Sequence, residues 1–334
     1  MNEQALVTII AVCYNHARFV VECLDSIRNQ TYPHVQIVIM DDCSQDDSPK
    51  IIREWIDYHG IACDFIAHQK NQGLCRTLNE ALKLARGKYI SIIATDDSWL
   101  TDKLARQVAA MESLPEEVGI VYSDAYQIDE HGHRLPEMFI EANHQIGSMP
   151  EGDVCERLIA GNFIPAMATI VRRTVYEGIG GYDERLVFED WDFWLRAACH
   201  FRFAFSPHPS ANYRILQTSM VRAVLSQQSA AVYHTYFLIF QKILAMTGLS
   251  QATRTLASAR FTHNARGMYV KDHPEATRAL FLAFAAARQF SDLYLALLAF
   301  LGIPYRRYAR ISSYLHWRLS GQRLPKSPSK DGRE

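Results

Sequence analysis

The sequence lacks any long uninterrupted apolar run. Hydrophobic residues make up 49% and charged residues 21% of the 334 residues, which is ordinary globular usage, yet no stretch reaches the ~18 apolar residues that a membrane span needs. The opening MNEQALVTII has no basic segment before its apolar residues, so we expect no signal peptide. The length fits one large α/β domain, or such a domain with a helical appendage. Because no signal peptide is expected, we place the protein in the cytoplasm.

Cysteine patterns and excess charge are also scarce. The seven cysteines contain no C-x-x-C pair, which indicates reduced thiols rather than a disulfide framework. The net charge of −1 gives no electrostatic case for binding nucleic acid. It is unevenly distributed, however, because residues 300–334 carry a net +6 and the rest −7. A basic end on an acidic body indicates an anionic surface nearby.

Several glycine and histidine motifs are missing. The turn after the first predicted strand, Val12–His16, contains no glycine, which argues against a dinucleotide-dependent oxidoreductase. Gly87-Lys88 is followed by Tyr and has no upstream glycine, so it is not a P-loop. His131-x-His133 is too isolated to support zinc hydrolysis.

Segments with a strand pattern and segments with a helix pattern alternate along the first half of the sequence. Alternation of this kind favours an α/β fold with a Rossmann-like, mostly parallel sheet flanked by helices. After residue 130 the pattern loosens into a turn at 131–133, an expected loop at 134–150 and a helix-rich region at 221–299. The first half predicts strands at 7–12, 35–40, 63–67, 89–94 and 119–122, and helices at 19–30, from 48 onward, at 74–84 and at 102–114.

Polar and acidic residues follow three of these strands, as Tyr14-Asn15, Asp41-Asp42 and Asp96-Asp97. Because ligands of such sheets lie beyond the carboxyl ends of the strands, we expect these side chains along one edge. An acidic pair there suits Mg²⁺ or Mn²⁺ bound together with a diphosphate. The alternatives are ordinary packing for Tyr14, a turn with Ser44 as a local cap for Asp41-Asp42, and helix capping for Asp96-Asp97.

A third acidic cluster, Glu189-Asp190-Trp191-Asp192, precedes a predicted amphipathic helix. The helix dipole would favour the ionised form of Asp190. An ionised carboxylate in a cleft can act as a general base on an alcohol. The alternative is an ordinary N-cap.

Taken in order, these segments resemble glycosyltransferase family 2, which has the GT-A fold. The resemblance extends from residue 6 to about 215 and is specific as an ordered set. The segments that carry it are VTIIAVCYN at 7–15, IMDDCSQD at 39–46, NQG at 71–73 with Asn79, ARGKYI at 85–90, TDD at 95–97, GGYDE at 180–184 and EDWDFWLR at 189–196.

The resemblance implies a role for each site residue. Tyr14 and Asp42 would hold the nucleobase, commonly uracil, while Asp97, helped by Asp96, would bind Mn²⁺ or Mg²⁺. Asp190 would be the catalytic base. Tyr213-Arg214, with Ser219 further on, resembles a segment that reaches the diphosphate, so Arg214 is a candidate phosphate contact, with a surface arginine as the alternative.

The implied activity is a metal-dependent, inverting hexosyl transfer from a nucleotide-diphospho-sugar, most simply a UDP-sugar, to a hydroxyl of a glycan or lipid-linked acceptor. The setting implied is bacterial cell-surface polysaccharide assembly. No Gln-x-x-Arg-Trp motif occurs, so we expect single-sugar addition rather than processive synthesis. Ala94 stands where the family often has the first Asp of its metal motif. The alternative is therefore a catalytically inactive member that binds a nucleotide-sugar or tethers partners at a membrane.

We expect a GT-A catalytic domain at 1–220, with nucleotide-sugar binding in 1–130 and the acceptor side in 131–220. A helical C-terminal region at 221–324 and a disordered tail at 325–334 would follow. The apolar run 293–303 precedes Arg306, Arg307 and Arg310, a pattern that fits peripheral contact with an anionic membrane on its inner face. The alternative is a helix packed on the catalytic domain with a solvated basic face.

Overall fold

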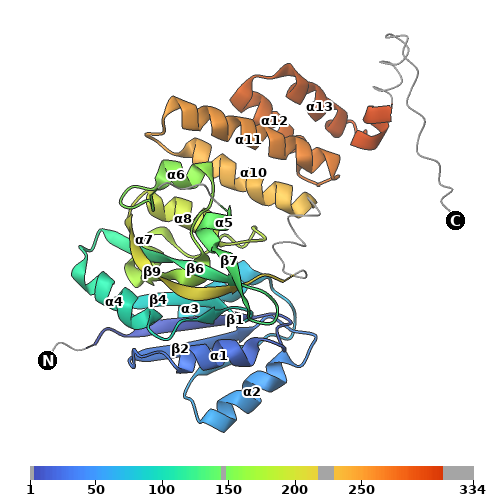
Figure 1. Ribbon diagram of the computed structural model, residues 1–334. Helices are drawn as coiled ribbons and strands as arrows, with labels where there is room; N and C mark the ends of the chain where they lie inside the picture. Colours follow the sequence, from blue (N-terminus) through green and yellow to red (C-terminus); the bar gives the residue numbers. More distant parts are fainter. Residues whose placement is uncertain (1–3, 144–147, 217–228, 311–334) are drawn as a thin grey trace. The chain divides into compact units, whose positions relative to one another are not determined.

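The protein is described from a computed structural model that covers residues 4–143, 148–216 and 229–310 (Figure 1). The chain divides into two compact units. The first comprises residues 1–227 and 246–253, and the second residues 228–245 and 254–334. The predicted boundary at 220–221 and the predicted tail at 325–334 both lie outside the described residues. The larger unit contains the sheet and the smaller one is helical.

The sheet has the strand order β3-β2-β1-β4-β8-β6-β9-β5, with β7 pairing on β6. β1 pairs in parallel with β2 and β4, and β2 pairs in parallel with β3. The strands are β1 (Val7–Cys13), β2 (Val35–Asp41), β3 (Asp64–Ala67), β4 (Tyr89–Ala94), β5 (Ser98–Trp99), β6 (Val118–Ile128), β7 (Arg134–Met138), β8 (Thr169–Arg172) and β9 (Arg202–Arg214).

Helices connect and cover these strands, as the alternating pattern predicts. The first unit contains α1 (Val20–Arg28), α2 (Ser48–His59), α3 (Leu74–Leu84), α4 (Lys103–Ser113), α5 (Phe139–Asn143), α6 (Cys155–Ala160), the 3₁₀ turn η1 (Ala166–Ala168), α7 (Arg173–Ile179) and α8 (Asp190–Ala198). The second contains α10 (Ala230–Ala245), α12 (Ala276–Ala287) and α13 (Phe290–Phe300), together with all but the first residues of α11 (Gln251–Val270).

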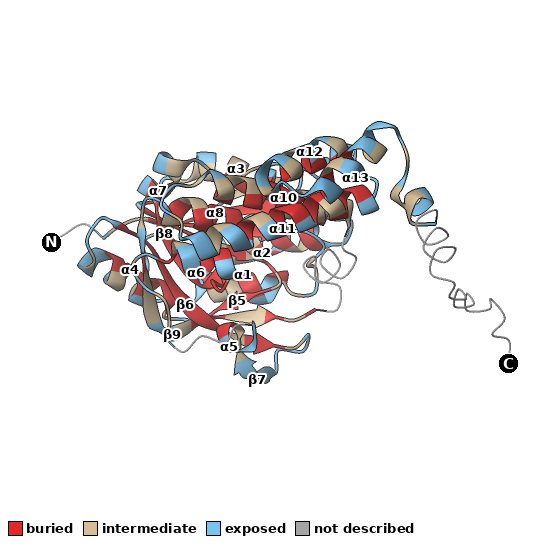
Figure 2. Ribbon diagram, turned by 90° about the horizontal axis from the view of Figure 1, so that it is seen from above, coloured by how far each residue is buried: buried red, intermediate tan, exposed pale blue. Residues whose placement is uncertain are grey.

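The main core lies between one face of the sheet and the helices α1, α2 and α4. Alternate residues of β1, such as Ile9 and Ala11, are fully buried there against Val20 and Leu24 of α1. The central strands are buried along most of their length (Figure 2). Because the sheet is covered in this way, polar side chains become available mainly where strands end.

The predicted α/β fold with a mostly parallel sheet, flanking helices and a helical C-terminal region is confirmed. One local expectation was wrong, because residues 134–143 form β7 and α5 rather than a loop. β7 is a strand because it pairs with β6, a neighbour provided by the tertiary structure. Within the described residues, no helix is both long and apolar enough to cross a membrane.

Candidate active site

The carboxyl ends of β1, β2 and β4 lie side by side. Cys13 is in register with Asp41, and Val12 with Ala94. Backbone hydrogen bonds continue past the strands, from Asp42 N to the Cys13 carbonyl at 2.9 Å and from Thr95 N to the Val12 carbonyl at 3.0 Å. The segments that follow these strands therefore start from one edge of the sheet.

The loop after β1 presents Tyr14 at this edge with 44% of the residue exposed. Asn15 has a φ of 59°, a left-handed conformation that asparagine tolerates better than most residues. Its backbone N–H donates to Ser44 Oγ at 2.8 Å, and its Oδ1 accepts from Gln45 N at 2.7 Å. These bonds fix the loop and leave the Tyr14 ring open to solvent, as stacking on a base requires. That stacking stays a prediction.

The two acids after β2 have different surroundings. Asp41 accepts hydrogen bonds from the backbone N–H and the hydroxyl of Ser44. These bonds form the turn that the sequence offered as the alternative to a binding role for Asp41. The buried Asp42 accepts from Gln72 N at 2.7 Å, Gly73 N at 2.9 Å and the His68 ring at 2.9 Å. Asp42 therefore fixes the loop that enters α3, and its contact with a nucleobase stays a prediction. Ser44 does not cap α2, whose N-cap is Asp47.

Asp96 and Asp97 lie between β4 and β5. The capping alternative is wrong for them, because the N-cap of α4 is Asp102. Asp97 Oδ1 accepts the backbone N–H of Arg214 at 2.8 Å. Burial, together with the neighbouring Asp96 charge, raises the pKa of the Asp97 carboxyl well above its ordinary value. His16 Nε2 lies 3.6 Å from Asp96 Oδ2.

This acidic pair fits a hard divalent cation. Both groups supply oxygen ligands, and a cation would offset the unfavourable burial of the Asp97 charge. In the described parts of the chain, no group of three or more His, Cys, Asp or Glu side chains gathers to hold a metal ion. Asp96 and Asp97 would therefore share the cation with oxygens from a bound diphosphate or water.

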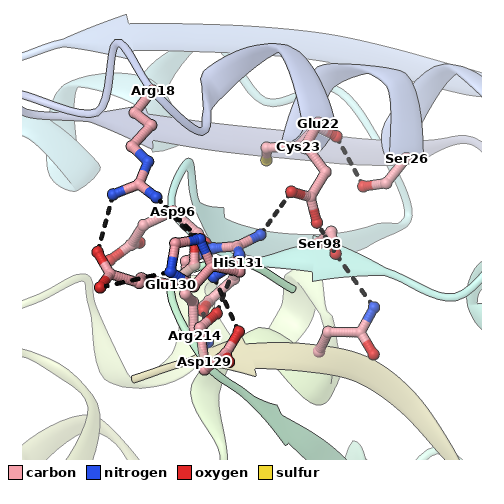
Figure 3. Close-up of polar contacts among 12 residues, drawn as sticks. Arg18, Glu22, Cys23, Ser26, Asp96, Ser98, Asp129, Glu130, His131 and Arg214 are labelled. Carbon is pink, nitrogen blue, oxygen red and sulfur yellow. Dashed lines mark hydrogen bonds and ion pairs between the residues drawn. The ribbon is translucent and has the colours of Figure 1, made fainter. Parts of the chain in front are cut away.

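Arg214, at the end of β9, holds this region together (Figure 3). Its guanidinium donates to Glu22 Oε2 at 2.6 Å, to the Asp96 carbonyl at 2.8 Å and to the Asp129 carbonyl at 3.2 Å. The residue is only 2% exposed and also lies over the Phe19 ring. Arg214 is therefore not a surface arginine, and it positions the acidic pair. Its direct contact with phosphate stays a prediction.

Asp190 is the first residue of α8. Its Oδ1 accepts the backbone N–H of Trp191 at 2.6 Å and its Oδ2 accepts Asn162 Nδ2 at 2.8 Å. Burial raises the pKa of this carboxyl, while the two donors favour its ionised form. Asp190 occupies the first helical position, whereas the N-cap is Glu189, which makes no side-chain capping bond. The ordinary N-cap alternative therefore does not describe Asp190.

Glu189 and Asp190 line a small cavity against Ile90 and Ile92 of β4 and Trp194 of α8. Burial and the Asp190 charge raise the pKa of Glu189 to about 8. The two donors favour the ionised form of Asp190 over that of Glu189, which lacks them. Asp190 thus adjoins the strand whose end carries the Asp96–Asp97 pair, but no hydrogen bond or ion pair among the described residues joins it to those acids.

Four further side chains in these clusters were not singled out as site residues from the sequence. His16 Nδ1 lies 3.0 Å from Thr95 Oγ1, and His68 lies between Asp42 and Glu80. Asn162 and Glu189 face Asp190. His16 follows Tyr14-Asn15 directly, so its place after the first strand was a usable signal. Asn162 has no such local signal, because its importance comes from the packing of its segment beside α8.

The pattern of residues 8–179, just over half of the chain, matches the family model described as "Glycosyl transferase family 2". The chain belongs to glycosyl transferase family 2. This family 2 glycosyltransferase is 27% identical over 237 residues to an uncharacterized glycosyltransferase of Methanocaldococcus jannaschii, covering 70% of this chain and 79% of the relative. It is 37% identical over 121 residues to the Escherichia coli UDP-Glc:alpha-D-GlcNAc-diphosphoundecaprenol beta-1,3-glucosyltransferase WfaP, covering 36% of this chain and 46% of WfaP.

Solved structures share the fold of this glycosyltransferase. Residues 1–349 of S. aureus TarS in complex with UDP-GlcNAc superpose with a TM-score of 0.63 at 17% identity, covering 97% of this chain and 94% of that one. The mannosyltransferase PcManGT from Pyrobaculum calidifontis, in complex with GDP-Man and Mn²⁺, gives 0.56 at 20% identity, covering 94% and 86%. At these identities the likeness establishes the fold.

Proposed function

We propose that this glycosyltransferase moves one sugar from a UDP-sugar to a hydroxyl of a glycan or lipid-linked acceptor, with inversion, in cell-surface polysaccharide assembly. WfaP is named as a UDP-glucose transferase that acts on a diphosphoundecaprenol-linked sugar. A relative in Bacillus subtilis is named as a putative teichuronic acid biosynthesis glycosyltransferase, 31% identical over 112 residues that cover 33% of this chain and 43% of the relative. TarS was crystallised with UDP-GlcNAc. These names support the donor and acceptor classes.

The donor would lie along the strand-end edge. The exposed ring of Tyr14 stacks on the uracil base, and the Asp42 segment supplies acceptors for base or ribose donors. Asp42 already binds two backbone N–H groups and His68. Its contribution is therefore mainly to hold the loop of the base pocket in place. Arg214 contacts phosphate only if it gives up part of its bonding to Glu22.

Asp96 and Asp97 would hold Mn²⁺ or Mg²⁺ beside the diphosphate. When bound, such a cation supplies Lewis-acid stabilisation of charge on the departing nucleotide diphosphate. The backbone N–H of Arg214 orients Asp97, and the Arg214 guanidinium orients the Asp96 carbonyl. The acidic pair is thus placed before any donor arrives.

The observation that carries the proposal is the hydrogen bonding of the Asp190 carboxyl. Two N–H donors favour the ionised form of its carboxyl, while burial and the Asp190 charge raise the pKa of the neighbouring Glu189. The acceptor hydroxyl oxygen attacks the anomeric carbon from the face opposite the diphosphate, and the bond between that carbon and the diphosphate oxygen breaks. The hydroxyl proton passes to Asp190, and the leaving group departs as the nucleoside diphosphate.

The second candidate is an inactive member that binds a nucleotide-sugar without turnover. Ala94, which ends β4 where the family often carries an acid, favours it. The presence of Asp97 and Asp190 favours the enzyme. Turnover separates the two.

The helical unit contains exposed apolar and basic residues that suit the membrane contact predicted from the sequence. Phe290, Leu297 and Leu301 are 79%, 47% and 68% exposed, and their spacing places them on one face of α13 and its C-terminal end. Arg306, Arg307 and Arg310 follow, all exposed. We propose that this apolar face, with the three arginines, rests on an anionic bilayer.

The test of the proposed function is donor turnover. The full chain is incubated with Mn²⁺ and a panel of UDP-sugars, and UDP release is measured with and without undecaprenyl-diphosphate-linked sugars. We expect at least one UDP-sugar to be consumed, faster with acceptor. Tight binding of UDP-sugars with no UDP release from any of them would support the inactive candidate instead.

A further inference from the structure

The helical unit contains a cavity of about 280 Å³ that the proposed chemistry does not use. It lies between the C-terminal half of α11, α13 and the segment that follows α13. Four tyrosines line it, Tyr269, Tyr294, Tyr305 and Tyr308, and we name it the tyrosine pocket. Its volume approaches the ~300–1,000 Å³ of pockets that bind small molecules.

The four rings form a connected wall. Ring centroids lie 5.8 Å apart for Tyr269–Tyr305, 5.9 Å for Tyr305–Tyr308 and 5.8 Å for Tyr294–Tyr308, all tilted or edge-to-face. No pair stacks in parallel, so none of these rings covers the face of another. Tyr269 is fixed by a 2.5 Å hydrogen bond from its hydroxyl to the Ile303 carbonyl.

The polar groups of the wall are hydroxyls rather than free charges. Among the described residues, the hydroxyls of Tyr294, Tyr305 and Tyr308 have no hydrogen-bond partner, so each can donate to or accept from a ligand. Ser291 adds another hydroxyl to the lining, although it already accepts a hydrogen bond from Arg266 at 2.9 Å.

Arg266 is the one charged side chain in the described lining. Its Nε donates to Asp292 Oδ1 at 2.6 Å, and another guanidinium nitrogen donates to Gln289 Oε1 at 2.8 Å. Asp292 is fully buried and balances the arginine charge. The pocket is therefore close to neutral, which favours a neutral ligand rich in hydroxyls over a free anion.

We propose that the tyrosine pocket binds a sugar ring. The apolar C–H face of a pyranose packs on tyrosine rings, and its equatorial hydroxyls exchange hydrogen bonds with the phenols, as amphipathic aromatic side chains permit. The ligand class is a neutral pyranose of a glycan. That this glycan is the acceptor rests on the proposed function, and binding of a sugar in the pocket does not.

The test is saturation-transfer NMR on the full chain with methyl β-D-glucopyranoside and methyl N-acetyl-β-D-glucosaminide. Saturating UDP is present to occupy the donor site. We expect saturation transfer to the sugar ring protons to persist with UDP. The affinity for the sugars should fall about ten-fold in Tyr294→Ala and in Tyr308→Ala. Tyr58→Ala, an 85% exposed tyrosine on α2, is the matched control and should bind like the parent.

Conservative variants separate a ligand contact from a folding defect. Tyr294→Phe and Tyr308→Phe keep the rings and should retain part of the binding, between the parent and the alanine variants. The proposal is overturned if neither sugar binds in the presence of UDP, or if Tyr294→Ala and Tyr308→Ala bind as well as Tyr58→Ala. The NMR measurement needs no turnover. Sugar binding in the tyrosine pocket can therefore be absent while the protein consumes a UDP-sugar, and it can be present when no UDP-sugar is consumed.

Discussion

At the scale of single residues, the proposed chemistry depends on which of two adjacent carboxyls ionises more readily. Glu189 and Asp190 share a partly buried location, but only Asp190 has two N–H donors. The hydrogen bonding therefore favours Asp190 over Glu189 for the proposed base role.

Asp190→Asn tests this assignment. Asparagine keeps the shape of the side chain but has no carboxylate to accept a proton, so we expect UDP release with acceptor to fall by about 10²–10⁴-fold. UDP affinity, measured by calorimetry, should be unchanged. Asp57→Asn, an exposed position on α2, is the matched control. Near-parental turnover in Asp190→Asn would remove this residue from the base role.

Glu189→Gln tests the raised pKa. A carboxyl whose folded pKa is about 8, against about 4.3 in the unfolded chain, binds more protons when folded, so its contribution to stability falls as pH rises across that window. Gln does not titrate. The melting temperature of Glu189→Gln minus that of the parent should therefore rise by at least about 2 °C between pH 5 and pH 8. Parallel melting curves across this range would contradict the raised pKa.

At the scale of elements, the sequence predicted the parts that local patterns determine. Helix α3 was predicted at its observed bounds because apolar spacing and the following Ala-Arg-Gly mark it. The strand-end position of Asp42 and Asp97 followed from the parallel register. β9 was not predicted, because it contains Pro207 and Pro209. These residues fall in an irregularity of the β6–β9 pairing, where a missing N–H is tolerated.

The partners of Arg214 were also beyond sequence reasoning. Its guanidinium binds Glu22, 192 residues earlier, and its backbone binds Asp97, 117 residues earlier. Pairings at such separations are set by the strand order of the sheet rather than by spacing along the chain. The same holds for Asn162, whose side chain reaches Asp190.

Gly87 gives a prediction for the junction of α3 and β4. A Cβ at this position would lie 2.4 Å from Thr8 N and 2.6 Å from the Tyr89 carbonyl, both backbone atoms. Gly87→Ala should therefore lower the free energy of unfolding by about 1–3 kcal/mol, measured by urea denaturation. Gly178→Ala is the control, because its Cβ would meet only the Phe201 ring at 3.6 Å. Equal stability of the two variants would show that the backbone at Gly87 can move away.

At the scale of the whole molecule, the uneven charge distribution predicts which part of the protein contacts an anionic membrane. Arg306→Gln/Arg307→Gln/Arg310→Gln in the full chain should weaken sedimentation with phosphatidylglycerol vesicles by about a hundred-fold, at about 1 kcal/mol for each arginine. Binding to neutral phosphatidylcholine vesicles should be weak for both proteins. Arg28→Gln/Arg53→Gln/Arg202→Gln removes three exposed charges elsewhere and should bind anionic vesicles like the parent. Identical sedimentation of all three proteins would refute the contact.

The position of Arg214 also affects how the site is made during synthesis. While a nascent chain emerges from the ribosome, strands β1 to β4 are complete long before β9 exists. Asp97 then lacks its backbone donor, and β5, which pairs with β9, has no neighbour. A fragment that ends near residue 130 would contain every proposed donor-binding acid and the partners of Asp42, but not the residue that orients Asp96 and Asp97. The proposed metal-binding part of the site is therefore completed only after residue 214 has been synthesised.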